Sequence, residues 1–244
     1  MALQITDTFT SLQNPVWVCP RCYQQTLECK KDSFRESPDR LSQKVIATDS
    51  FHPYELTGGV FSSLLECVSS SCREVVACSG TFTYEIDHAP DWVNEPDTYF
   101  EEYKPKFFTP PLHAFPIPAD CDKSIFDPLI GSFSLLPSSP VAASNQLRIA
   151  VEKYLDVIRV PAAKMLVARI RTLEHTDPAK FALLDSLRLL GNSGSHEVGS
   201  VDDEDVMVGY EVIRKLLEDQ YPEAKLDDSQ KHAQSLTEKF KKKL

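Results

Sequence analysis

The spacing of apolar residues along the chain changes near residue 139. Before this point, short apolar runs such as VWVC and EVVACSGTFTYEI are separated by polar turns, which is typical of β-strands. Beyond it, apolar residues recur with the period of a helix, in segments long enough for several turns. The pattern therefore predicts an α+β chain in which a β-rich part precedes a helical part.

Amphipathic helices with recognisable starts are expected after residue 139. The first follows Ser139–Pro140 and the third follows Asp177–Pro178, because each pair places a capping side chain before a proline suited to the first helical position. A second helix is expected over residues 162–173, and a fourth after the acidic stretch 202–205. The apolar stripes comprise Leu147, Val151, Tyr154, Leu155 and Ile158 in the first helix and Phe181, Leu184, Leu187 and Leu190 in the third. Short joins between such helices favour an antiparallel bundle.

Two cysteine pairs in the β-rich part have the spacing of metal ligands. The predicted ligands are Cys19, Cys22, Cys67 and Cys72. Four thiolates can close a tetrahedral zinc shell with no open position, so the predicted zinc is structural. The second pair is more widely spaced than usual, and Cys29 or Cys78 remains an alternative to Cys67 as a ligand. A redox-active Cys19–Cys22 pair is the competing interpretation, but it needs a βαβ context that the sequence does not offer.

These patterns divide the chain into four predicted segments. We expect a small zinc-ribbon-like β domain over residues 1–98, an extended connector rich in proline and aromatic residues over 99–138, the helical bundle over 139–228, and a basic tail over 229–244. The connector contains YFEEYKPKFFTPPLHAFPIPAD, whose prolines remove N–H donors and disfavour regular helix. Its rings are expected to pack on one or both neighbouring parts.

The charge and the N-terminal residues limit the function classes. A formal net charge of −10 argues against a protein that coats nucleic acid, because such binding needs clustered Lys and Arg. The segment 140–200 is mildly basic, so a local anion site remains open. The start MALQITDTFT lacks the features of a signal peptide, and no apolar run approaches the length of a membrane span. We therefore expect a cytoplasmic protein that does not bind membranes.

The stretch LRLLGNSGSH, residues 187–196, combines groups that could cleave RNA without a metal ion. His196 could transfer a proton to or from a ribose or leaving oxygen, Arg188 could stabilise a charged phosphorane, and Asn192 could orient either partner. Arg188 and Asn192 are four residues apart and share a helix face. The competing interpretation is an ordinary helix end at Asn192 and Gly194, followed by a histidine that bonds the last carbonyls.

The order of these features resembles a bacterial family of domains of unknown function. The resemblance is carried by CPRC, the Cys67–Cys72 pair, YKPKFFTPP, AASNQLRIAVEKYL and LRLLGNSGSH, and it runs from about residue 19 to about residue 221. It implies an N-terminal zinc ribbon and a helical domain of the HEPN superfamily (higher eukaryotes and prokaryotes nucleotide-binding). Members occur with restriction and anti-phage defence systems, which implies a defence-system protein as a partner.

Active members of the superfamily use an arginine, a polar residue and a histidine, usually in dimers formed through the helical bundle. By resemblance, Asn192 matches the polar position and His196 the histidine, but Gly191 stands where the arginine would be. Arg188, one turn earlier, is the nearest candidate for the missing charge. Arg148 is a second candidate for an anion contact.

Two functions remain open at this point. The first is a defence-associated RNA-binding or endoribonuclease-like protein with a structural zinc site. The second is a non-catalytic HEPN-like interaction module that binds a partner protein or a nucleotide ligand. The acidic charge and the displaced arginine favour the second, whereas the presence of Arg188, Asn192 and His196 favours the first. A DNA-binding regulator is disfavoured because residues 1–139 are net acidic.

Overall fold

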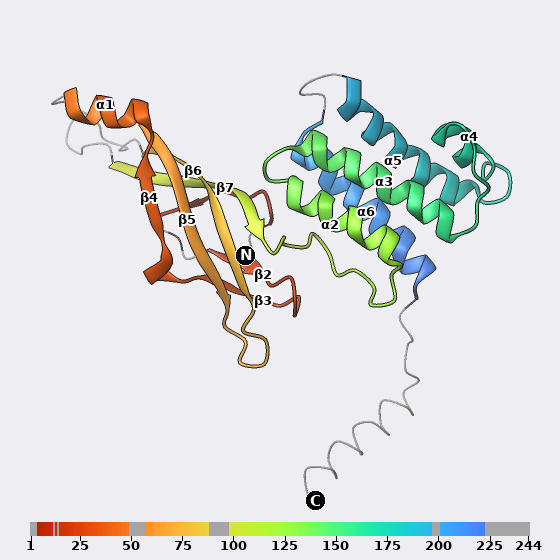
Figure 1. Ribbon diagram of the computed structural model, residues 1–244, viewed down its shortest axis with the longest axis horizontal. Helices are drawn as coiled ribbons and strands as arrows, with labels where there is room; N and C mark the ends of the chain where they lie inside the picture. The colour runs from red at the N-terminus through yellow and green to blue at the C-terminus, as the bar shows by residue number, and fades with distance from the viewer. Residues whose placement is uncertain are drawn as a thin grey trace, which may run out of the picture.

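The computed structural model describes residues 4–11, 13, 15–48, 57–87, 98–196 and 201–222 of the chain. A β-rich part comes first along the chain and a helical part follows it (Figure 1). The α+β class expected from the sequence is confirmed. The predicted tail, residues 229–244, lies outside the described residues.

The β-rich part is one antiparallel sheet that curls into a half-barrel. Its seven strands are β1 (Phe9–Thr10), β2 (Val16–Val18), β3 (Gln25–Cys29), β4 (Arg35–Pro38), β5 (Gly58–Cys67), β6 (Val75–Asp87) and β7 (Thr98–Thr109). They pair in the order β1-β7-β6-β5-β3-β2. Strands β3 and β4 lie along the same edge of β5, where β3 pairs with residues 65–67 and β4 with residues 59–62. Between them lie the short helix η1 (Lys31–Ser33) and helix α1 (Arg40–Thr48).

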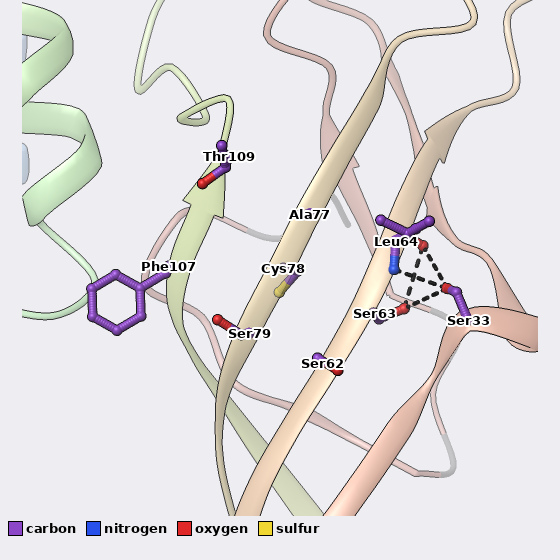
Figure 2. A pocket seen from close by; sticks show the side chains of 9 residues that line it. All are labelled: Ser33, Ser62, Ser63, Leu64, Ala77, Cys78, Ser79, Phe107 and Thr109. Carbon is purple, nitrogen blue, oxygen red and sulfur yellow. Dashed lines mark hydrogen bonds between the residues drawn. The ribbon is translucent and has the colours of Figure 1, made fainter.

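The two faces of the sheet differ in side-chain composition. Alternate residues of β5, β6 and β7 place Phe61, Phe82 and Tyr103 in a buried aromatic core, where Trp17 is also buried. On the opposite face Phe107 is exposed beside a hollow of about 240 Å³ that is lined largely by serines and other small residues (Figure 2). The core of this part therefore lies on one side of the sheet.

The helical part contains α2 (Lys123–Leu135), α3 (Pro140–Val157), α4 (Leu166–Arg171), α5 (Pro178–His196) and α6 (Asp203–Gln220). Three of the predicted helix starts, at Ser139, Asp177 and Asp202, are confirmed by their caps. The second helix, expected over residues 162–173, is shorter, because α4 begins only at Leu166 and has no capping side chain. Ser139 Oγ accepts a hydrogen bond from the Ala142 N–H, and Asp202 forms a capping box with Asp205. In the core, the Ser132 hydroxyl donates to the Ala143 carbonyl, so the Tyr210 hydroxyl must donate to Ser132.

The predicted fold was wrong in two respects. The N-terminal part is not a small zinc ribbon, because its cysteine turns belong to a seven-stranded half-barrel. The helical part is not a HEPN bundle, because it has five helices within the described residues, including α2, which the sequence pattern did not predict.

Proline explains why β7 and α2 were missed in segment 99–138, which was predicted as an extended connector. Pro105 is tolerated within β7 because it pairs with Gly80, beside a register shift between Ser79 and Gly80. Pro128 lies inside α2, whose buried Ile125, Leu129 and Phe133 recur at helical spacing. The segment thus contributes one strand to the sheet and one helix to the helical part.

Candidate functional site

Two turns at one end of the sheet hold the four predicted cysteine ligands. Cys19 and Cys22 lie in the turn that joins β2 to β3. Cys67 is the last residue of β5, and Cys72 lies in the turn that leads to β6. Antiparallel pairing of Leu27 with Cys67 brings the two turns together, although the two cysteine pairs are far apart in the sequence.

The two turns share a backbone conformation. The residue after the second cysteine of each pair is left-handed, with φ of 55° at Tyr23 and 57° at Arg73. The Tyr23 N–H donates to the Cys19 carbonyl and the Arg73 N–H donates to the Ser69 carbonyl. Residues other than glycine rarely take this conformation. Each turn therefore holds its backbone in one specific geometry, and together the two turns bring the four thiols into one cluster.

The four sulfur atoms have the spacing of a metal shell. All four lie within 4.8 Å of one another, with 3.7 Å between the Cys19 and Cys72 sulfurs and 3.8 Å between those of Cys22 and Cys67. A regular tetrahedron with metal–sulfur bonds of about 2.3 Å has edges of about 3.8 Å. The four cysteines could therefore hold a metal ion with little rearrangement.

The surroundings of the sulfurs favour a thiolate at one position and disfavour it at another. Burial raises the pKa of the Cys19 thiol to about 12. Burial also acts to raise the pKa of Cys22, but the Gln24 backbone N–H, the Thr26 hydroxyl and the neighbouring thiols outweigh it and lower that pKa to about 7. The Thr26 hydroxyl also lies 3.1 Å from the Cys67 sulfur. A bound cation would deprotonate the remaining thiols as it coordinated them.

A second concentration of predicted residues lies in the helical part. Arg148 of α3 and Arg188 and Asn192 of α5 line one pocket with a volume of about 490 Å³. The pocket is completed by Glu152, Ala163, Lys164, Met165, Leu166, Val167 and Arg169. We refer to it as the arginine pocket. The charged lining residues are four cations and one carboxylate. Arg169 is ion-paired with Asp156 at 2.7 Å and Arg188 with Asp185 at 2.6 Å, so Lys164 and Arg148 carry most of the charge left for an anionic ligand.

The arginines of this pocket have different partners. Arg169 is buried and donates to the carbonyls of Val160 and Glu152, so it holds the end of α3. The Arg188 Nε donates to Asp185 Oδ1 at 2.6 Å. By contrast, the buried Nε of Arg148 has no hydrogen-bond partner among the described residues, because its nearest carboxylate oxygen, on Glu152, is 3.6 Å away.

Gly191 is explained by the approach of α3 to α5. A Cβ atom at this position would lie 2.7 Å from the Cβ of Arg148 and 3.2 Å from its Cδ. A larger residue would displace the Arg148 stem, which is a physical reason for glycine at this position.

Helix α5 continues to His196 and does not end at Asn192 and Gly194 as expected. The backbone positions of Arg188, Asn192 and His196 therefore recur every four residues along one face. The side chain of His196 lies outside the described residues. Sequence reasoning missed Lys164 and Arg169 as pocket residues, and the only available signal was the group of basic residues in segment 162–173.

Two family models match the chain. Residues 7–110 match the domain of unknown function DUF8608, and residues 132–243 match the domain of unknown function DUF4145. The first match ends just beyond β7, and the second begins within α2. No curated protein matches the chain, and no solved structure matches it. Among the described residues, no helix is both long and apolar enough to cross a membrane.

Proposed function

We propose that this protein binds RNA by holding a phosphate in the arginine pocket, while a structural zinc ion at the four cysteines stabilises the sheet. The observation that carries the proposal is the meeting of Arg148, Arg188 and Asn192, singled out from the sequence, in one pocket beside Lys164. Guanidinium groups recognise phosphate through several N–H donors at once, and an amide can add a further hydrogen bond.

Two side chains leave room for a ligand oxygen. Arg148 has a buried Nε–H that lacks a hydrogen-bond acceptor among the described residues. Lys164 is exposed at the rim and forms no ion pair with any described residue. The Nε itself is enclosed, so a phosphate oxygen would bind the exposed part of the Arg148 side chain, which is 34% exposed, and would neutralise Lys164. Few charged contacts are available, so the expected mode is local binding of a single strand, which is consistent with the acidic net charge of the chain.

The test is RNA binding by the zinc-loaded full chain, followed by fluorescence polarisation of a labelled single-stranded RNA pool. Arg148→Gln and Lys164→Ala are each expected to weaken binding about tenfold and to reduce the salt dependence by about one phosphate contact. Arg171→Gln removes an exposed arginine from α4 that does not line the pocket, and it serves as the matched control.

Three results would contradict this proposal. One is equal loss of affinity in the Arg171 control and in the pocket variants, because general electrostatics would then explain the binding. The other is equal affinity for DNA of the same sequence, which would remove the case for RNA. Wild-type protein that binds neither polymer would also reject it.

Zinc is the ion proposed for the four cysteines because four thiolates in tetrahedral spacing are its usual structural site. Native mass spectrometry of the full chain should find one zinc ion. Cys19→Ser should lose it, whereas Cys121→Ser, outside the cluster, should retain it. Iron in place of zinc, or zinc retained in the Cys19 variant, would reject this assignment.

RNA cleavage is a second candidate, favoured by the unbroken course of α5 through His196. In this alternative His196 transfers a proton, Arg188 stabilises the phosphorane and Asn192 orients the substrate. One such set lacks a second acid or base, which a second copy of the chain could supply. A mixed RNA pool without added metal ions should be cut by the zinc-loaded wild type and by neither His196→Ala nor Arg188→Ala; an inert wild type would leave RNA binding without cleavage.

A further inference from the structure

One residue of the first cysteine turn contacts the segment that leads into the helical part. The Tyr23 hydroxyl lies 2.8 Å from Nδ1 of His113, a hydrogen bond between residues 90 positions apart. Tyr23 immediately follows Cys22, and its left-handed backbone is part of the turn that aims the Cys22 thiol at the cluster. The position of this hydroxyl therefore depends on the geometry of the turn.

His113 continues the contact into the helices. Its ring lies 5.8 Å from that of Phe133 in α2, and Phe133 packs edge-on against Tyr210 of α6 at 4.9 Å. Both Phe133 and Tyr210 are almost fully buried. A chain of contacts thus runs from the cysteine cluster through Tyr23 and His113 to the core of the helical part.

We propose that metal binding at the four cysteines holds the helical part against the sheet, with Tyr23 as the positioning residue that connects them. This inference rests on the proposed zinc ion. With the metal bound, the turn at Cys22 is fixed and Tyr23 keeps His113 packed on Phe133. Without it, only weak hydrogen bonds between thiols, and no disulfide, connect the two cysteine turns, and Tyr23 is released together with the segment 111–117.

Burial of His113 makes its ring an acceptor for the Tyr23 hydroxyl near neutral pH. Burial lowers the pKa of His113 to about 4, so the ring is neutral near neutral pH and can accept a hydrogen bond at Nδ1. A single hydrogen bond of this kind changes an opening equilibrium about fivefold. Opening of residues 111–117 is therefore a measurable readout that does not depend on RNA binding.

The experiment is hydrogen–deuterium exchange of the full chain, with zinc and after chelation, with bound metal counted by native mass spectrometry. Chelation is expected to speed exchange in peptides covering 111–117 as well as those covering 68–74. Tyr23→Phe with zinc still bound should speed exchange at 111–117 about fivefold and leave 68–74 unchanged. Tyr103→Phe, which removes a hydroxyl that donates to Glu36 within the sheet, is the matched control and should leave exchange at 111–117 unchanged.

The possible results test the positioning role of Tyr23 separately from the presence of zinc at the four cysteines. Unchanged exchange at 111–117 in zinc-loaded Tyr23→Phe overturns the positioning role of Tyr23. Protection retained at 111–117 after chelation, while 68–74 becomes exposed, overturns control by the metal. Wild-type protein without bound metal rejects the proposed zinc site itself, and with it any metal control of this contact.

Discussion

Replacing Arg148 with methionine is expected to make the protein more stable and to weaken its RNA binding. The Nε of Arg148 is buried without a hydrogen-bond acceptor among the described residues, which is a cost that the folded state bears. Methionine keeps an unbranched stem over Gly191 and removes the charge. Arg148 therefore lowers the stability of the folded chain while lining the arginine pocket. A ligand bound in that pocket is the best explanation for an arginine at this position.

The magnitude follows from the contacts that are lost. Removing an unsatisfied buried N–H recovers about 1–3 kcal/mol. Against this, the variant loses the ion pair with Glu152, worth about 0–1 kcal/mol because the two side chains are 34% and 44% exposed and 3.6 Å apart. Arginine and methionine have similar helix propensities. The net expectation is a gain of about 1 kcal/mol, or about 2–4 °C in Tm for a chain of this size.

Arg188→Met is the matched comparison for this variant. The Arg188 Nε bonds Asp185 at 2.6 Å, and the two side chains are 14% and 27% exposed, so the substitution leaves a partly buried carboxylate unpaired. It should lower the free energy of unfolding by about 1–2 kcal/mol. Urea unfolding of both variants and the wild type measures the two changes in the free energy of unfolding. A loss of stability in Arg148→Met equal to that in Arg188→Met would refute the reasoning.

Three further substitutions test the packing and the buried groups. Tyr210→Phe removes the hydroxyl that donates to Ser132 and should cost about 1 kcal/mol in urea unfolding; a variant as stable as the wild type would contradict the assigned bond. Gly209→Ala places a Cβ 2.6 Å from Leu190 Cδ2, and overpacking of α6 on α5 is offset by about 1 kcal/mol of helix propensity, so stability should fall by about 1 kcal/mol; a raised Tm would contradict the close approach. Because burial lowers the pKa of His113 from 6.5 to about 4, the unfolded state takes up a proton first as the pH falls, and the free energy of unfolding should decrease between these values. His113→Gln should show a weaker decrease over the same range, measured by urea unfolding at several pH values, and an unchanged slope would count against a buried neutral ring.

The features that sequence analysis predicted are those with local signals. Ser139 and Asp202 cap helices where expected because a capping side chain and its N–H partner are three residues apart. The cysteines were identified by the short spacing within each pair. What joins the pairs is the register of Leu27 against Cys67, a non-local pairing that no spacing in the sequence records.

The features that were missed depend on tertiary context. Pro105 in β7 and Pro128 in α2 contradict the local rules for strand and helix, and their surroundings accommodate them. The arginine pocket could not be assembled from sequence, because Lys164 and Arg148 line the same pocket only through the packing of α3 and α4 against α5. The sequence resemblance suggested that an arginine is missing at Gly191. The structure shows that the stem of Arg148 leaves little space for a side chain there.

The separation of sheet partners along the chain has a consequence for biosynthesis. Cys19 and Cys72 are 53 positions apart, whereas Thr8, next to the first strand, bonds Glu102 of the last, 94 positions away. A ribosome adds about 5–20 residues per second, so all four thiols leave the exit tunnel some seconds before β7 is available. An ion captured at that stage would fix the register of β2, β3 and β5 in a nascent chain whose β1 still lacks its partner β7 and whose β6 can pair only with β5. Metal supply during translation, and not only in the finished protein, should therefore determine how much of the chain escapes aggregation.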